Sequence, residues 1–158
     1  PVFSARLKAL SNVLATAEQN ATERKIDPQV FLSARLAPDM FALTRQVQIA
    51  TDHAKGAPSR LAGREVPKYE DNEASFADLE ARIAKTVAYL ATFSAAEING
   101  SDDRMIDVKL GGRELSMPGM QYLLNLAMPN FYFHLTTAYD ILRHNGVPLG
   151  KATFLGSR

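Results

Sequence analysis

Residues 120–146 read MQYLLNLAMPNFYFHLTTAYDILRHNG, and they are the most informative part of the chain about its fold. Apolar side chains recur in it every three or four residues, which is the spacing of one face of an α-helix. Gly146 can adopt the left-handed conformation that ends a helix, and Pro148 follows it. The pattern therefore predicts a long last helix over about residues 120–145. Pro129 lies inside this helix and cannot donate a backbone hydrogen bond, so we expect a kink there.

Three more helices are predicted upstream of this one. The same periodicity runs over about residues 2–20, 39–63 and 75–98. Asp39 and Ser75 belong to the residue types that cap helix N-termini, and each stands where a periodic stretch begins. Four amphipathic helices with modest connections bury their apolar faces best as a bundle.

The stretch before the last helix follows a different pattern. Polar and apolar side chains alternate over about residues 104–117, with Gly111 and Gly112 in the middle. Alternation around a glycine pair is typical of a β-hairpin. We therefore expect an all-α fold, an up-and-down four-helix bundle with one short β-hairpin between its third and last helices. No linker divides the chain, so residues 1–158 should form a single domain.

The composition is that of a globular protein without a strongly charged partner. The chain has 158 residues, of which 46% are hydrophobic, and it carries 18 basic against 17 acidic side chains. No cluster of lysine and arginine stands out, which argues against nucleic acid as a partner. The absence of cysteine excludes disulfides and thiolate metal sites. The most apolar stretch, residues 120–135, is too short to cross a bilayer, so we expect a cytoplasmic protein with no membrane partner.

Two polar side chains fall on the apolar face of the last helix. Asn130 and His134 are four residues apart, so they lie one turn apart and should point toward the core. A buried polar group without a hydrogen-bond partner costs about 1–3 kcal/mol, so something must meet them. His53 and Gln46 lie on the flank of the helix predicted over residues 39–63. They are the expected partners if the two helices pack together.

Side chains around this pair could form a pocket or simply pack. Tyr122 and Tyr139 belong to the same helix and could line a ligand site together with Gln46. In the simpler interpretation, His134 is a hydrogen-bonded core residue and the tyrosines pack at the rim of the core. The acidic residues 71–73 are interpreted as a solvated loop that leads into a helix.

No established catalytic signature accompanies these residues. The sequence has no G-x-S-x-G, no P-loop and no G-x-G-x-x-G. No two carboxylates stand three residues apart on an apolar face, which argues against a di-iron bundle. The sequence therefore leaves open whether the protein is an enzyme.

Four stretches carry a resemblance to a known family. They are LAPDMF at 36–41, RQVQIA at 45–50, PNFYFH at 129–134 and ILRHNG at 141–146. Together with the order of the predicted elements, they make the chain resemble the DinB/YfiT-like superfamily of bacterial four-helix bundles, which are regarded as metalloenzymes. Within that superfamily the chain is similar to a small bacterial family of unknown function, over almost its whole length.

The resemblance implies where a metal would bind. Active members of the superfamily hold a divalent ion with one histidine on the second helix and an H-x-x-x-H pair on the last. By position, His134 matches the second histidine of that pair, and Asn130 stands in place of the first. The remaining ligand falls within residues 46–53, where His53 is the only imidazole. A carboxamide binds Zn²⁺ or Ni²⁺ far more weakly than imidazole, so we expect no cofactor, with one of these ions as the alternative.

Three functions are open on this basis. The incomplete ligand set favours a non-catalytic binding or oligomeric module with a vestigial site. The second function is a divalent-metal-dependent enzyme, a transferase or hydrolase, with thiol dependence implied by the resemblance. The third is a metal-free small-molecule-binding protein, in which His134 is a hydrogen-bonding group or general base. The resemblance also implies a homodimer, and a lone two-stranded hairpin needs cover from its bundle or from a partner.

Overall fold

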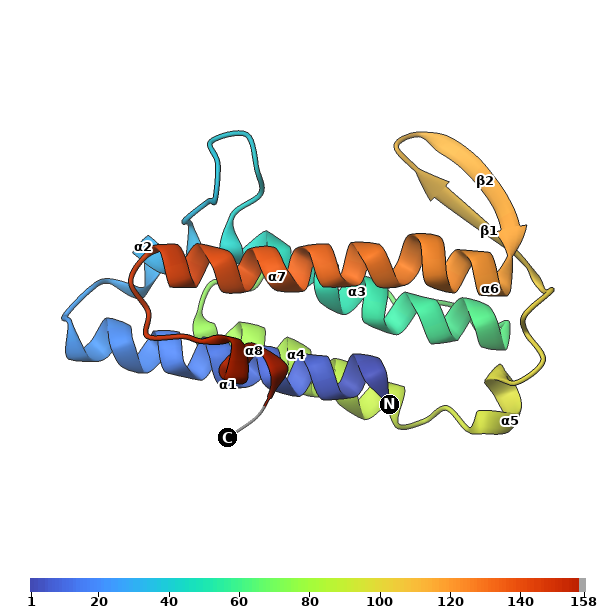
Figure 1. Cartoon of the computed structure of the whole chain (residues 1–158), viewed down its shortest axis with the longest axis horizontal. Coiled ribbons are helices and arrows are strands. Elements are labelled where there is room, and N and C mark those ends of the chain that lie inside the picture. Colours follow the sequence, from blue (N-terminus) through green and yellow to red (C-terminus); the bar gives the residue numbers. More distant parts are fainter. Residues whose placement is uncertain (157–158) are drawn as a thin grey trace.

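The fold consists of four long helices in two layers. The computed structural model describes residues 1–156, and Figure 1 shows α3 and α7 above α1 and α4. α3 packs against both α7 and α4, and α1 packs against α4. In chain order the elements are α1 (Val2–Glu23), α2 (Pro28–Leu32), α3 (Leu43–Ala62), α4 (Phe76–Leu90), α5 (Ala95–Ile98), β1 (Met105–Leu110), β2 (Arg113–Pro118), α6 (Gly119–Gln121), the π-helix η1 (Tyr122–Ala127), α7 (Met128–His144) and α8 (Lys151–Leu155). The predicted helical bundle with one hairpin before its last helix is confirmed.

The core is built from the apolar faces that helical periodicity predicts. Leu10 and Leu14 of α1, Leu79 of α4, and Leu135 and Ile141 of α7 belong to one buried cluster. α3 contributes buried residues along its whole length and packs against each of the other three long helices, most extensively against α7 and α4. It is therefore the central helix of the bundle. Within residues 1–156, the helices fall short of the length and apolarity that crossing a membrane requires.

The start of α3 differs from the prediction. The helix begins at Leu43 rather than at Asp39, and Ala42 occupies the N-cap position without a side-chain hydrogen bond. Asp39 lies exposed in a turn of the connector formed by residues 33–42. The backbone N–H of Leu43 donates to the carbonyl of Ala34 at 2.9 Å, which closes this connector into a loop. The prediction was wrong because aspartate stabilises turns as well as helix starts, and spacing alone does not separate the two.

The start of α4 agrees with the prediction, and its end does not. Ser75 is the N-cap, its hydroxyl accepts from the backbone N–H of Asp78 at 3.1 Å, and the Asp78 carboxylate stabilises the same turn. The helix ends at Leu90 instead of near residue 98. Ser94 and Glu97 form a second capping box, which starts the short helix α5 after a break in the chain direction.

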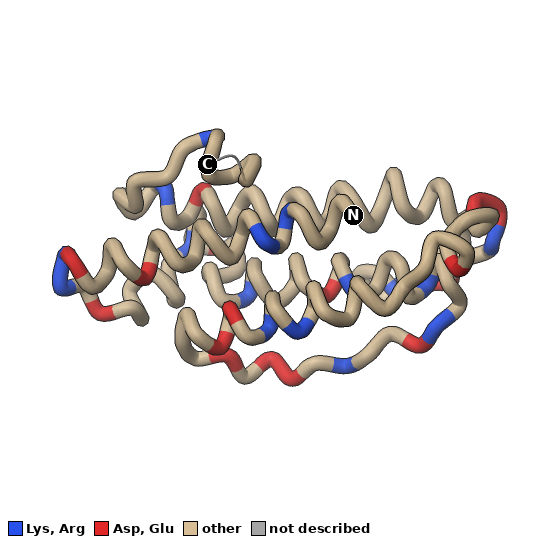
Figure 2. Tube along the Cα trace, turned by 90° about the horizontal axis from the view of Figure 1, so that it is seen from below, with Lys and Arg blue, Asp and Glu red and all other residues tan. Residues whose placement is uncertain are grey.

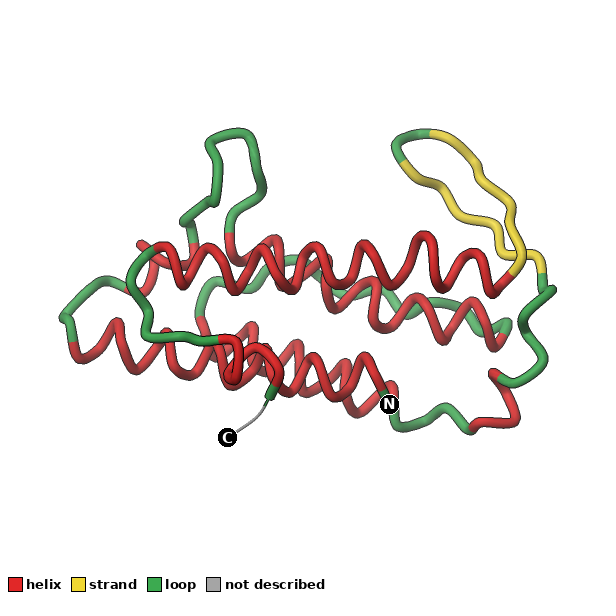
Figure 3. Tube along the Cα trace, in the orientation of Figure 1, coloured by secondary structure: helices red, strands yellow, loops and turns green. Residues whose placement is uncertain are grey.

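The hairpin joins the last helix through a crowded glycine. β1 and β2 pair in antiparallel register from Met105 opposite Pro118 to Leu110 opposite Arg113, and the ribbon projects away from the bundle (Figure 3). Gly119 follows immediately, and a Cβ atom there would collide with the backbone carbonyl of Ser101. Only glycine therefore lets the hairpin and the helix meet at this distance.

The last helix runs without interruption from Gly119 to His144, but its second turn is wider than an α-helix. Residues 122–127 form a π-helix, in which hydrogen bonds span five residues rather than four. Pro129 follows directly after it, inside the continuous helix, where it has no backbone N–H to donate to the preceding turn. The irregularity that we expected at Pro129 therefore takes the form of a π-helix one turn earlier.

Candidate functional site

One face of α3 carries three polar side chains at intervals of seven residues, namely Gln46, His53 and Arg60. Seven residues bring a helix back to within about 20° of the same direction, so these side chains share a stripe. The stripe lies along the last helix, because Gln46 contacts His134 and Arg60 contacts Tyr122. We call the three α3 residues together with His134 the α3 strip.

Gln46 fixes the state of the His134 ring. The Gln46 Nε2 donates to the backbone carbonyl of Phe41 at 3.0 Å, so the amide oxygen faces His134 and lies 2.7 Å from its Nδ1. An amide oxygen can only accept, and Nδ1 must therefore carry the proton. In a neutral imidazole this leaves Nε2 as a lone-pair acceptor. Gln46 is only 1% exposed, so the arrangement is held by a packed side chain.

His53 lies beside His134 and shares its electrostatic surroundings. The two rings are nearly parallel, with an interplanar angle of 12° and centroids 6.1 Å apart. Burial lowers the pKa of His134 to about 4, and the His53 ring and the Arg45 guanidinium act in the same direction. Burial also lowers the pKa of His53, against the opposing charge of Asp52. Both imidazoles are therefore neutral near pH 7.

Asn130 makes its hydrogen bond within its own helix. Its Nδ2 donates to the carbonyl of Leu126 at 2.7 Å, and the side chain is half-buried. His134 is also half-buried, so the pair lies at the edge of the bundle and not in its middle. The prediction that both side chains point into the core was therefore wrong. The reason is that helical spacing places a residue on a face of its helix but does not say how deeply that face is buried.

Arg60 brings a positive charge to the α3 strip. A Cβ atom at Gly56 would collide with its guanidinium, which folds back along α3 on the side of His53. Its Nη1 donates to the buried hydroxyl of Tyr122 at 3.2 Å. Among residues 1–156, Arg60 has no carboxylate partner. Sequence analysis missed Arg60, although its seven-residue spacing from His53 was a usable signal.

The two tyrosines predicted to line a pocket have different positions. Tyr122 is 2% exposed and reaches the α3 strip through its hydrogen bond with Arg60. Tyr139 instead packs edge-on against Phe154 of α8, with ring centroids 5.5 Å apart. It lies about 140° around the last helix from His134. The pocket prediction was therefore wrong for Tyr139.

Two comparisons identify the family. Residues 1–155 match a family described as a domain of unknown function, DUF1993. The chain belongs to the DUF1993 family. It is also similar to a DinB family member protein from Shewanella denitrificans, whose crystal structure gives a TM-score of 0.88 at 43% sequence identity. This likeness covers 99% of the DUF1993 chain and 88% of the other one. No curated protein matches the chain significantly.

The DinB-like resemblance implies a divalent metal, but the donors of this DUF1993 chain do not fit one well. Two imidazoles that bind one zinc ion at the tetrahedral angle have ring centroids about 5 Å apart, whereas those of His53 and His134 are 6.1 Å apart. The third predicted ligand, Asn130, offers only a carboxamide oxygen. Within residues 1–156, no three His, Asp or Glu side chains form a group that could hold a metal ion. The predicted set therefore offers two strong ligands and one weak one, whereas a catalytic zinc site has three strong protein ligands.

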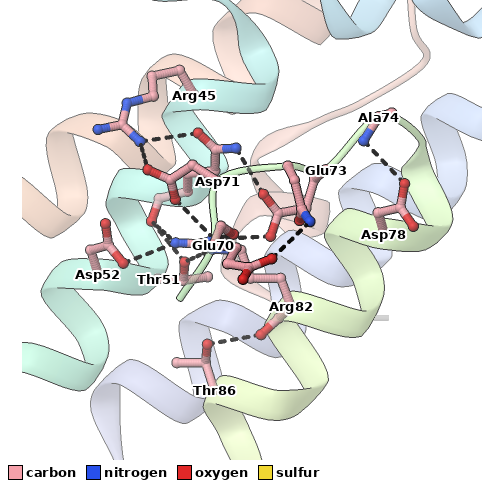
Figure 4. Close-up of polar contacts among 12 residues, drawn as sticks. Arg45, Thr51, Asp52, Glu70, Asp71, Glu73, Ala74, Asp78, Arg82 and Thr86 are labelled. Atoms are coloured by element: carbon pink, nitrogen blue, oxygen red, sulfur yellow. Dashed lines mark hydrogen bonds and ion pairs between the residues drawn. The ribbon is translucent and has the colours of Figure 1, made fainter. Parts of the chain in front are cut away.

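A second polar cluster of the DUF1993 chain joins α3, α4 and the connector between them. Figure 2 shows acidic residues spaced along that connector, and Figure 4 shows how they meet Arg82. The Arg82 side chain is 2% exposed and lies 2.9 Å from both Asp52 and Glu73 and 3.1 Å from Asp71. Its Nε donates to the Thr51 hydroxyl at 2.7 Å.

The polar groups around Arg82 satisfy one another's hydrogen bonds. Every nitrogen of the Arg82 guanidinium has at least one partner, and Asp71 is also paired with Arg45. The interpretation of residues 71–73 as a solvated loop before a helix holds for Asp71 and Asn72, which are exposed, but not for Glu73, whose side chain is 8% exposed. The carboxylates of Asp71 and Glu73 also hold the connector against the bundle through Arg82. We assign the cluster a structural role, since it leaves no donor of Arg82 free for a ligand.

Proposed function

We propose that the protein is a non-catalytic binding module, in which the α3 strip takes a small polar molecule without a resident metal. The observation that carries this proposal is the state of His134. Its Nδ1 is fixed by Gln46, whereas its Nε2 has no hydrogen-bond partner in the described part of the chain. Nε2 is not buried, so solvent and a small polar ligand can both reach its lone pair.

The low pKa of His134 favours binding over catalysis. A general base works best when its pKa is close to the operating pH. With a pKa of about 4, His134 holds its lone pair at pH 7 but attracts a proton about a thousandfold less strongly than a base of pKa 7. The ring is therefore suited to accept a hydrogen bond from a ligand rather than to remove its proton.

Arg60 supports a ligand that is also negatively charged. Its guanidinium has a tyrosine hydroxyl as partner and no carboxylate, so an anionic group could add a charge-assisted hydrogen bond. The proposed ligand is a small acid that carries a hydroxyl or amine, with its acidic group at Arg60 and its donor at His134. Hydroxy acids and amino acids belong to this class.

The first experiment tests the state of the ring. Long-range nitrogen–proton NMR spectra of ¹⁵N-labelled protein at pH 7 should show His134 as the neutral tautomer with its proton on Nδ1. In Gln46→Leu, which removes the acceptor, this preference should disappear. A wild-type ring protonated on Nε2 would overturn the proposal.

The second experiment tests the ligand. Lactate, malate, serine and glycerol 3-phosphate are titrated against the intact protein while its thermal unfolding is followed. At least one should raise Tm, and the gain should vanish in Arg60→Met and in His134→Phe. The control is Arg113→Met, which changes an exposed arginine on the hairpin and should leave the gain intact. Four titrations without a shift, or shifts that survive Arg60→Met, would contradict the proposal.

Metal titration separates this proposal from the enzyme alternative. Calorimetry with Zn²⁺ and Ni²⁺ should detect only weak binding, since two imidazoles are fewer strong ligands than zinc enzymes use. Tight stoichiometric binding that is lost in His134→Ala would instead support a metal-dependent enzyme, as the DinB-like resemblance implies.

A further inference from the structure

A cavity of the described chain lies away from the α3 strip. Its volume is about 600 Å³, and it opens at the end of the bundle where α1 begins and α4 ends (Figure 1). Its walls come from α1, α3, α4, α5, η1 and α7, so six elements meet around it. Cavities of this size hold ligands of the size of typical cofactors and drugs.

The cavity separates two parts of the hydrophobic core. The main cluster fills the space between the four long helices, and the second gathers Leu61, Ile106 and Tyr122 under the hairpin. Phe3 packs against both clusters, and Leu61 and Phe3 both line the cavity. The bundle therefore stops short of complete packing at the place where its two cores approach each other.

Two irregularities of helical backbone border this space. Pro58 lies inside α3 and lines the cavity, although a proline there removes one hydrogen bond of the helix. Leu123 lines it from the π-helix, and Met128 from the start of α7. Such features are costly, and π-turns occur frequently at functional sites. Packing alone does not explain why both irregularities border the same cavity, because regular helices could have packed closely enough to fill this space.

The lining selects the chemistry of a ligand. Most of the walls are aliphatic or aromatic, and the polar side chains among them are Ser4, Ser94 and Asn99. None of the lining side chains is charged. A carboxylate or ammonium group would lose its hydration there without gaining an ionic partner among the lining side chains, which disfavours charged molecules. A neutral molecule with an apolar body would bury its surface and could still find a hydroxyl or amide at the rim.

We propose that this cavity binds a neutral, largely apolar small molecule, such as a long-chain alcohol or an uncharged aromatic amine. The site differs from the α3 strip in position and in chemistry, because the strip offers an arginine and two imidazoles. The two proposals therefore stand or fall separately.

The test uses N-phenyl-1-naphthylamine, an uncharged probe whose fluorescence rises in apolar surroundings. Titration into the intact protein should give saturable binding of one probe per chain. Ala91→Phe and Ala95→Phe place a ring at the rim from exposed positions and should weaken binding by about tenfold or more. Ala88→Phe adds the same ring on the exposed surface of α4, outside the cavity, and should leave binding unchanged.

Competition in the wild-type protein needs no variant. Dodecanol should displace the probe, and dodecanoate, its charged counterpart of equal length, should displace it much less. The proposal would be overturned if probe binding does not saturate or if it is unchanged in both Ala91→Phe and Ala95→Phe. It would also be overturned if dodecanoate displaces the probe as well as dodecanol does.

Discussion

At the scale of single residues, His134 owes its properties to its neighbours. Gln46 holds the proton on Nδ1, and burial together with Arg45 and His53 keeps the ring neutral. The amide of Gln46 is in turn oriented by the carbonyl of Phe41, a residue of the connector before α3. The state of one imidazole therefore depends on the position of a loop.

Acidification should destabilise the protein through His134. The unfolded chain takes up a proton on this ring near pH 6.5, whereas the folded protein resists it down to a pKa of about 4. The unfolded state then binds more protons, so the free energy of unfolding falls as the pH falls through this window. We expect a loss of about 1–2 kcal/mol between pH 6.5 and pH 5, allowing for partial exposure of the ring. The lowered pKa of His53 acts in the same direction.

Denaturant unfolding at these two pH values measures the effect. His134→Gln should lose clearly less stability than the wild type on acidification. His144→Gln removes an exposed histidine and should lose as much as the wild type. An equal loss in His134→Gln and in the wild type would show that other groups cause it.

A carboxylate in place of Gln46 should reverse the electrostatics of the ring. In Gln46→Glu, the negative charge lies at hydrogen-bond distance from Nδ1 and stabilises the protonated imidazole, so the pKa of His134 should rise well above 4. NMR titration of the ring protons measures this shift. Gln46→Leu adds no charge and should cost about 1–3 kcal/mol of stability, because Nδ1–H and the Phe41 carbonyl lose their partner. An unchanged pKa in Gln46→Glu would contradict the contact.

Part of the site was predictable from the sequence. Helical spacing placed Asn130 and His134 one turn apart, and the packing of two helices brought His53 and Gln46 to His134 as expected. Spacing did not give the rotation of each helix about its axis. Asn130 was therefore placed in the core, although its side chain donates to the backbone carbonyl of Leu126 in the same helix. Arg60 was missed because its direction depends on the space that Gly56 leaves.

At the scale of elements, regular helices were predicted well and irregular segments were not. Gly63 ends α3 in the left-handed conformation, and Ser75 caps α4, as their residue types suggest. The connector between them looked like solvated chain because its partner Arg82 lies 9 to 12 residues further along the sequence, beyond the reach of local patterns. The π-helix was not predicted, since no residue type marks one in the way that glycine and serine mark helix ends.

Arg82 should be the most important side chain for holding the connector between α3 and α4. In Arg82→Met, three carboxylates lose a buried cation, and we expect a loss of about 3–5 kcal/mol of stability. Limited proteolysis should also cut residues 64–75 faster. Arg143→Met, which changes an exposed arginine of α7, should cost less than about 1 kcal/mol. Similar losses in the two variants, measured by denaturant unfolding, would contradict the assigned role.

At the scale of the whole molecule, a homodimer stays a prediction. Two segments project from the same side of the α3–α7 layer, the connector of residues 33–42 and the hairpin (Figure 1). Both carry exposed large hydrophobic side chains, among them Phe41 and Leu110. A face of this kind, with a ribbon that has uncovered edges, is suited to pairing with a second copy.

Light scattering after size-exclusion chromatography tests this prediction. The wild type should have twice the mass of one chain at micromolar concentration, and Phe41→Glu with Leu110→Glu should reduce it to one. Val30→Glu changes an equally exposed side chain on α2 and should remain dimeric. A wild-type monomer throughout this range would show that the projecting segments serve another purpose.

The π-helix at residues 122–127 sets the rotation of the hairpin end of the last helix relative to the part that carries His134. It holds one more residue than an α-helical turn, and one residue corresponds to about 100° of rotation. Deleting that residue would rotate Tyr122 away from Arg60. The hairpin would rotate with it, because Gly119 is in close contact with the Ser101 carbonyl. His134, downstream of the turn, would keep its place. A single extra amino acid thus sets the orientation of the hairpin relative to His134.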